Sequence, residues 1–214
     1  MTSHLKIDFV SDVSCPWCVV GLKALEQALE RVGDSITTEL HFQPFELNPH
    51  MAPEGENTVE HLAHKYGFTP AQAAVNKENI RVRGAELGFI FHMDQRNRIY
   101  NTFDAHRLLH WAGLEGRQHA LKQALFDAYF TLGQNPSDPA LLVQVAGQVG
   151  LDPVRAQAIL DSDEFADAVR EREQFYTAQG IHSVPAVIIN DRHLISGGQP
   201  PEMFEQALRQ IAAA

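Results

Sequence analysis

The sequence predicts an α/β protein in which a long helical segment separates a β-α-β unit from a β-β-α unit. Strand-like apolar runs lie near the two ends of the chain, and the middle segment carries helix signals. Both cysteines stand where the first strand gives way to the first helix. We place one domain at residues 1–57 and 180–214 and the inserted all-helical domain at residues 58–179.

The N-terminal unit is predicted to be strand, helix, strand. Residues 5–10 form a short apolar run, and residues 36–45 form a second one. Between them, residues 16–32 place apolar side chains at three- and four-residue spacing, as an amphipathic helix requires. Pro16 suits the first helical position and Gly33 suits the terminating position. The helix is therefore expected to begin directly after Cys15.

The C-terminal unit is predicted to be a β-hairpin followed by a helix. Residues 184–189 are a β-branched run, Asn190-Asp191 suit a turn, and residues 192–196 return as a second strand. In the middle of the chain a polar cap, often a proline, apolar periodicity and a glycine recur in that order. This pattern predicts helices over residues 58–66, 69–88, 102–112, 117–132, 138–150 and 163–179, with a short one from residue 152. The last helix of the C-terminal unit is expected from about residue 200.

Composition and charge exclude several classes of partner. The formal net charge of −10 over 214 residues argues against nucleic-acid and anionic-membrane binding, which need basic surface. No window approaches the roughly 18 consecutive apolar residues of a membrane span, and the N-terminus lacks a signal-peptide pattern. We expect a cytoplasmic protein that acts as a monomer or homodimer.

Residues 14–18 read Ser-Cys-Pro-Trp-Cys and hold the most informative chemistry in the chain. The positive end of a helix favours a thiolate, and the thiolate is the nucleophile in disulfide exchange. Cys15 is expected to be the exposed attacking sulfur, and Cys18, one turn into the helix, the more buried resolving thiol. Pro16 and Trp17 are expected to tune the thiolate and to contact substrate. Because structural disulfides are rare in the cytoplasm, redox chemistry is the preferred interpretation.

Two other interpretations of the cysteine pair stay open. A structural zinc site needs four ligands, and the chain has no third cysteine. Histidines at helical spacing, His61 with His64 and His106 with His110, could complete a Cys₂His₂ site, although no finger-like spacing follows Cys18. A buried structural pair without redox function is the other alternative. The preferred interpretation predicts no metal and no tightly bound cofactor, only a redox-active disulfide.

Val184-Pro185 is the second informative stretch. A proline that opens a buried strand needs a special geometry, which a cis peptide bond supplies. The β-α-β and β-β-α units are the two halves of a thioredoxin fold, where such a proline packs opposite the redox cysteines. The backbone of the residue before it can pair with an extended substrate. Taken alone, the stretch suits an ordinary trans proline at a strand start, but the cysteine motif upstream favours a cis bond at Pro185. We also expect substrate contact at Val184.

Several motifs, taken in order, resemble a known family. They are residues 7–18 (Ile-Asp-Phe-Val-Ser-Asp-Val-Ser-Cys-Pro-Trp-Cys), 45–49, 101–107, 183–185 and 195–200. Together they resemble the DsbA-like thioredoxin family, in particular its FrnE branch, over essentially the whole chain. The resemblance implies a thioredoxin fold with an inserted helical domain and a redox-active Cys15–Cys18 disulfide. It also implies thiol-disulfide oxidoreductase or isomerase activity on protein or peptide thiols.

The related kappa-class glutathione transferases and 2-hydroxychromene-2-carboxylate isomerases commonly carry serine at the position of Cys15. The dithiol in this chain favours redox chemistry. The alternative function is a glutathione-dependent isomerase or transferase acting on a small, polyketide-like organic molecule. Glutathione would then be a co-substrate held beside Pro185 and the loop at Gly197.

Four further residues have weaker claims. Asp8 and Asp12 could each accept a proton near Cys18, because perturbed acids mark functional sites. Asn101 lies on the inserted segment that approaches the redox site in the family, and it could cap a helix or contact substrate. Gly197 is assigned to substrate binding through its loop.

Overall fold

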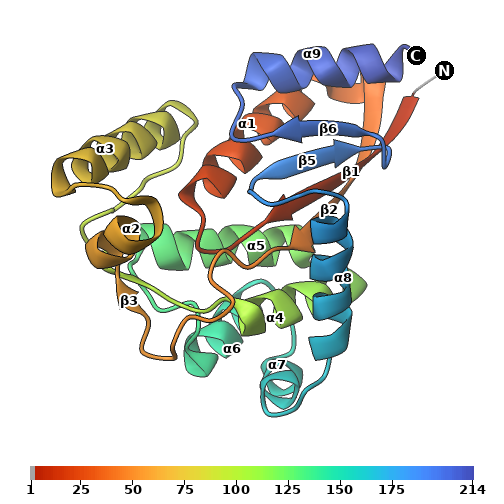
Figure 1. Cartoon of the computed structure of the whole chain (residues 1–214). Helices are drawn as coiled ribbons and strands as arrows, with labels where there is room; N and C mark the ends of the chain where they lie inside the picture. The colour runs from red at the N-terminus through yellow and green to blue at the C-terminus, as the bar shows by residue number, and fades with distance from the viewer. Residues whose placement is uncertain (1–2) are drawn as a thin grey trace.

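A computed structural model describes residues 3–214 and places one four-stranded sheet at the centre of the molecule (Figure 1). The N-terminal unit consists of β1 (Ser3–Ser11), α1 (Pro16–Val32), a 3₁₀ turn at Gly33–Ser35 and β2 (Ile36–Pro44). The C-terminal unit consists of β5 (Ala186–Ile189), β6 (His193–Ser196) and α9 (Pro201–Ala212). These elements confirm the predicted thioredoxin fold and the start of α1 at Pro16.

The strand order is β2-β1-β5-β6, so β1 is a central strand. β1 runs parallel to β2, with Phe9 opposite Phe42, and antiparallel to β5, with Phe9 opposite Val187. Every residue of β1 from position 7 to 11 is buried, as expected for a strand covered on both faces. Figure 1 shows α1 and α9 on one side of the sheet and most of the inserted helices on the other. The loop that follows β1 therefore starts in the interior of the protein, between the helices on the two sides of the sheet.

Most of the chain between residues 45 and 185 is helical, and it also contains two short strands. Its elements are β3 (Glu56–Asn57), α2 (Thr58–Tyr66), α3 (Pro70–Glu86), β4 (Arg98–Ile99), α4 (Phe103–Leu114), α5 (Gln118–Phe126), α6 (Pro139–Gln148), α7 (Pro153–Leu160) and α8 (Ala166–Ala178). The helix expected over residues 117–132 is interrupted, because residues 127–131 form a π-helical turn after α5. The two-residue strands β3 and β4 were not predicted, since they are too short to show a period of two.

The loop between β1 and α1 sets the position of Cys15. The Asp12 carboxylate accepts a hydrogen bond from the backbone N–H of Ser14 at 3.1 Å, which folds the loop into an Asx turn. The N–H of Cys15 in turn donates to the carbonyl of Asp12 at 3.3 Å. Cys15 has an extended backbone (φ −91°, ψ 113°) and Pro16 occupies the first helical turn. The thiol therefore stands at the N-terminal end of α1.

Helices α2 and α3 stand apart from the rest, on the side of the molecule where α1 begins (Figure 1). Asn57 caps α2 through bonds from the N–H groups of Val59 and Glu60. Thr69 and Gln72 form a reciprocal capping box at the start of α3. Local capping thus stabilises two helices that bury few side chains. Across residues 3–214, no helix combines the length and apolar character needed to cross a membrane.

Candidate active site

Cys15 and Cys18 occupy the first turn of α1 as two free thiols with different surroundings. Cys15 is 4% exposed and Cys18 is completely buried. The expectation that Cys15 is exposed is therefore wrong, because the residue packs into the core with its thiol against Val184. Both cysteines belong to the same hydrophobic core cluster, but only Cys15 also lines a cavity. A substrate sulfur could thus reach Cys15 before Cys18.

Val184 and Pro185 face the start of α1 from the other half of the fold. The Val184-Pro185 peptide bond is cis, as predicted. The Cys15 thiol lies 3.7 Å from the Val184 carbonyl oxygen, a length suited to a weak sulfur hydrogen bond. This approach depends on Gly21, where a Cβ atom would lie 2.9 Å from Pro185 Cγ. The glycine on α1 lets the cis-proline pack against the helix that carries both cysteines.

The two thiols differ in acidity as well as in access. The hydrogen bond from Cys18 lowers the pKa of Cys15, and this effect outweighs burial, which acts to raise it. Burial raises the pKa of Cys18 well above its ordinary value, and the hydrogen bond it gives to Cys15 raises it further. Of the two thiols, Cys15, the sulfur that lines the cavity, is therefore the one that loses its proton more readily.

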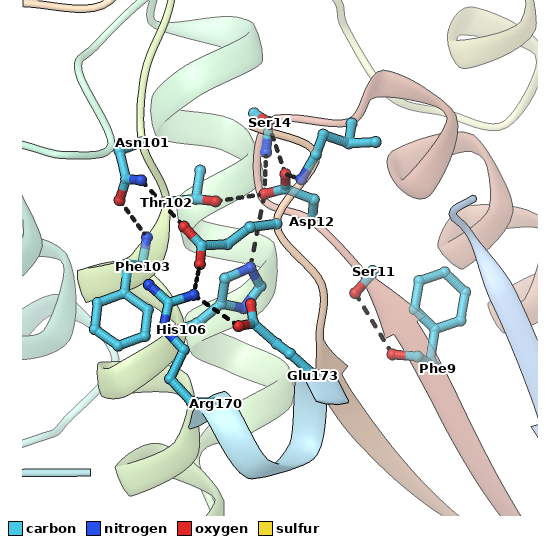
Figure 2. A network of polar contacts seen from close by, with 12 residues as sticks. Phe9, Ser11, Asp12, Ser14, Asn101, Thr102, Phe103, His106, Arg170 and Glu173 are labelled. Atoms are coloured by element: carbon cyan, nitrogen blue, oxygen red, sulfur yellow. Dashed lines mark hydrogen bonds and ion pairs between the residues drawn. The ribbon is translucent and has the colours of Figure 1, made fainter. Parts of the chain in front are cut away.

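Asp12, in the loop that precedes Cys15, is the centre of a buried polar network (Figure 2). Its carboxylate accepts hydrogen bonds from the Ser14 hydroxyl at 3.0 Å, the Leu47 N–H at 2.7 Å and the Thr102 hydroxyl at 2.7 Å. His106 Nε2 on α4 lies 3.6 Å from the same carboxylate. Burial alone would raise the pKa of Asp12, but His106 and the hydrogen bonds from Leu47 and Thr102 hold that pKa at about 2. The carboxylate therefore stays ionised and is a weak proton acceptor.

The network continues from Asp12 towards α8. The buried Glu46 forms an ion pair with Arg170, which also pairs with Glu173 at 2.8 Å. Burial raises the pKa of Glu173, and the neighbouring Glu46 charge raises it further. Figure 2 shows the Glu173 carboxylate beside the His106 ring. Side chains of the insert thus surround the loop that carries Cys15.

Asp8 lies away from this network, on β1. Its carboxylate accepts a hydrogen bond from the Gln43 amide at 2.6 Å and pairs with Lys6 at 3.1 Å. Asp8 is not among the cavity-lining residues. Of the two acids named from the sequence, Asp12 is the one in the loop that precedes Cys15.

A cavity of about 890 Å³ opens beside Cys15. Pro16, Trp17 and Val184 line it, so the structure brings these three predicted residues together with Cys15. The opposite wall comes from α2 and α3, including Leu62, Tyr66, Ala73 and Ile80. Arg96 also lines the cavity, and its guanidinium donates to the Ser14 carbonyl at 3.2 Å.

Two residues assigned to substrate binding are placed elsewhere. The amide of Asn101 donates to Glu46 at 3.1 Å, and its oxygen accepts from the Phe103 N–H at 2.9 Å, near the start of α4. Gly197 donates its N–H to the Pro185 carbonyl at 2.8 Å, with φ at 81°. Neither residue lines the cavity. Asn101 acts in helix capping and in the Asp12–Glu46 region, and Gly197 holds the loop that follows the cis-proline.

The histidines considered as zinc ligands do not converge on the cysteines. His61 and His64 both contact Glu56, at 2.6 and 2.9 Å, and His106 faces Asp12. Within the part of the chain that the structure describes, no group of three or more His, Cys, Asp or Glu side chains is arranged to hold a metal ion. The geometry offers no support for a Cys₂His₂ site.

Sequence reasoning missed one buried group near the site, Lys122 on α5. The Lys122 side chain is completely buried and its Nζ has no hydrogen-bond partner among residues 3–214. The available signal was its position between Leu121 and Leu125, on a helix face otherwise expected to enter the core. A lysine at such a position is rarely fully buried unless it is paired.

Comparison with known proteins fits this architecture. A family model described as the DSBA-like thioredoxin domain matches residues 6–209. The chain belongs to the DSBA-like thioredoxin family. Because the match spans nearly the whole chain, the helical insert belongs to the family domain together with the sheet.

Three proteins illustrate the range of similarity within DSBA-like folds. A structure described as a probable DsbA oxidoreductase, SCO1869 from Streptomyces coelicolor, is 33% identical with a TM-score of 0.91, covering 97% of this chain and 89% of that one. A curated relative, uncharacterized protein YwbO of Bacillus subtilis (strain 168), is 28% identical over 97% of this chain and 96% of its own length. Cytosolic disulfide reductase DsbM from Pseudomonas aeruginosa, solved with GSH, is 16% identical with a TM-score of 0.66, covering 98% of this chain and all of that one. The last similarity shows the fold alone.

Proposed function

We propose that this DSBA-like protein is a thiol-disulfide oxidoreductase in which Cys15 is the nucleophile and Cys18 the resolving thiol. The supporting observation is the asymmetry of the pair. Cys15 has a lowered pKa and lines the cavity, while Cys18 is buried with a raised pKa. A nucleophile needs a thiolate and access, and a resolving thiol needs only the sulfur of its neighbour.

The reaction proceeds in two exchanges when the protein acts as a reductant. The Cys15 thiolate attacks a substrate disulfide, forms a mixed disulfide and releases the first substrate sulfur as a thiolate. Cys18, once deprotonated, attacks Cys15 Sγ, so that the Cys15–Cys18 bond forms and the second substrate thiolate leaves. Two electrons pass from the two cysteines to the substrate. The same steps in reverse oxidise a dithiol.

Val184 supports a peptide-like substrate in this proposal. Its carbonyl already faces the Cys15 thiol at 3.7 Å, and an extended chain could pair with the same backbone. The apolar wall from α2 and α3 would cover side chains on either side of the substrate sulfur. The cytoplasmic location and the monomer-or-homodimer state remain predictions from the sequence.

Reduction of insulin by dithiothreitol, with and without the protein, tests this function. The wild-type protein should accelerate insulin precipitation, and Cys15→Ser should reduce the rate to background. Serine is close to cysteine in size, so circular dichroism should show an unchanged fold. Undiminished activity of Cys15→Ser would remove the proposal.

A glutathione-dependent enzyme acting on a small organic molecule is the second candidate. The cavity volume lies within the range of small-ligand pockets, and the structurally similar DsbM was solved with GSH. Calorimetric titration of Cys15→Ser with glutathione separates the two functions. Tight glutathione binding that survives the loss of Cys15, together with turnover of a small substrate, would favour this candidate.

A further inference from the structure

Lys122 differs from every other lysine in the described part of the chain. Lys6, Lys23 and Lys77 each pair with a carboxylate, and Lys65 donates to Asn48. The Nζ of Lys122 has no oxygen partner within residues 3–214, although the side chain is completely buried. Burying an unpaired ammonium group raises the free energy of the folded protein. Its surroundings must therefore offset that free energy in some state of the protein.

Hydrogen bonds in the turn before Lys122 hold α5 in place. One turn earlier on α5, the Gln118 amide bonds both the N–H and the carbonyl of Phe42 on β2, at 2.9 and 3.0 Å. The neighbouring His119 contacts Glu26 of α1 at 2.7 Å. Helix α5 is thereby held against β2 and α1, and Lys122 lies on the side that enters the core between them.

An aromatic ring lies beside Lys122 Nζ, in the core that also holds both cysteines. The Phe126 ring centroid lies 5.0 Å away, and Phe126 belongs to the same core cluster as Cys18. Burial lowers the pKa of Lys122 to about 8, and the groups that act to raise it are Cys18, Asp12 and Cys15. All three belong to the loop and helix start that form the candidate active site. Other titratable or charged groups line a small cleft together with Lys122, namely His41, His106, His110 and Arg172.

We propose that Lys122, supplied by the inserted domain, is the buried cation that stabilises the thiolate state of the Cys15–Cys18 pair and so makes its disulfide a stronger oxidant. This inference rests on the proposed function. The disulfide is neutral and the reduced pair carries a thiolate, so a nearby ammonium stabilises only the reduced form. Stabilising the reduced form makes the disulfide more oxidising. Lys122 is a positioning residue in this scheme, since it acts through the two sulfurs.

The equilibrium with glutathione measures this effect directly. One protein disulfide and two reduced glutathione molecules exchange with one protein dithiol and one oxidised glutathione. Lys122→Met keeps the length of the side chain and removes the charge. We expect this variant to shift the equilibrium at least fivefold towards the protein disulfide, where a tenfold shift would equal about 30 mV. Lys23→Met, which removes a paired lysine from α1, should stay within twofold of wild type.

Thermal unfolding of Lys122→Met separates this role from a structural one. Removing a lone buried charge should leave stability unchanged or higher. An equilibrium within twofold of wild type, together with lower stability, would overturn the proposal and leave Lys122 a structural residue. A wild-type protein that forms no Cys15–Cys18 disulfide in glutathione buffers would overturn the proposed function as well.

A second measurement needs no variant of Lys122. Carbon-13 labelling of the lysine side chains allows NMR titration of the unmodified protein in its oxidised and reduced forms. The pKa of Lys122 should be lower in the oxidised protein, where no thiolate offsets its charge. Equal values in both forms would contradict the inference even if Lys122→Met failed to fold.

Discussion

Asp12 Oδ1 and His106 Nε2 lie 3.6 Å apart, and neither side chain is more than 2% exposed. Asp12 belongs to the loop before Cys15, whereas His106 belongs to the inserted helix α4. The negative charge of Asp12 acts to raise the pKa of Cys15, and His106 from the insert in turn lowers the pKa of Asp12. The inserted domain thus contributes to the electrostatics of the redox site as well as to the cavity.

The buried Asp12 carboxylate predicts a loss of stability in acid. Its pKa of about 2 lies below the ordinary 3.8, so its contribution is fully present above about pH 4 and is lost as the pH falls through 2. At about 1.4 kcal/mol per pKa unit, this contribution is roughly 2 kcal/mol. Urea unfolding of the wild-type protein between pH 5 and pH 2 should show this loss of unfolding free energy. The Asp12→Asn variant should show a weaker dependence on pH over the same range.

A matched control for Asp12→Asn is Asp152→Asn. Asp152 caps α7 at an exposed position, where asparagine caps equally well. This variant should follow the wild-type curve. An Asp12→Asn protein with the full wild-type pH dependence would show that the acid transition has another origin.

The hydrogen bond between the two thiols predicts a difference between substitutions at Cys18. That bond is the leading cause of the lowered pKa of Cys15. Cys18→Ser keeps a donor at this position and Cys18→Ala removes it, so Cys15 should titrate at higher pH in Cys18→Ala. The ultraviolet absorbance of the thiolate measures both titrations, and identical curves would mean that the helix terminus alone stabilises the thiolate.

The close packing of Gly21 predicts that a single methyl group there disturbs the site. In Gly21→Ala the new Cβ would lie 2.9 Å from Pro185 Cγ, which belongs to a rigid ring. Overpacking costs about 1–3 kcal/mol, partly offset by the roughly 1 kcal/mol that alanine adds in a helix. We expect a net loss of up to about 2 kcal/mol in unfolding experiments and slower insulin reduction, because the Val184 carbonyl moves relative to Cys15.

Gly147→Ala serves as the comparison for Gly21→Ala. In α6 the added Cβ would lie 3.1 Å from Pro153 Cγ, again a proline ring, at a position that does not line the cavity. Its insulin reduction rate should match wild type whatever happens to its stability. Equal activity losses in both variants would attribute the effect of Gly21→Ala to general destabilisation.

Local signals in the sequence were sufficient to predict most of the fold. Pro16 and Gly33 bracket α1 because proline suits a helix start and glycine a helix end, and the structure begins and ends this helix between them. The strands β3 and β4 escaped prediction because each has two residues and pairs only with the other. The π-helical turn after α5 left no separate signal, since Ala128, Tyr129 and Phe130 continue the buried apolar face of the helix.

The site was less predictable than the fold. The cysteines, Pro16, Trp17 and Val184 follow from short motifs with a fixed local geometry. The contact of Asp12 with His106, and the packing of α5 with its buried Lys122 against β2, join segments far apart in the chain. Hydrophobic periodicity predicts which face of a helix is buried, but it does not predict which residues that face contacts. For the same reason Asn101 and Gly197 were assigned to substrate but lie outside the cavity lining.

Trapping of a mixed disulfide tests the central claim most directly. Each single-cysteine variant, Cys15→Ser and Cys18→Ser, is incubated with oxidised glutathione and analysed by intact-protein mass spectrometry. We predict rapid formation of a glutathione adduct on Cys15 in Cys18→Ser and slow or no adduct on Cys18 in Cys15→Ser. Equal labelling of the two variants, or faster labelling of Cys18, would contradict the assignment of Cys15 as nucleophile and Cys18 as resolving thiol.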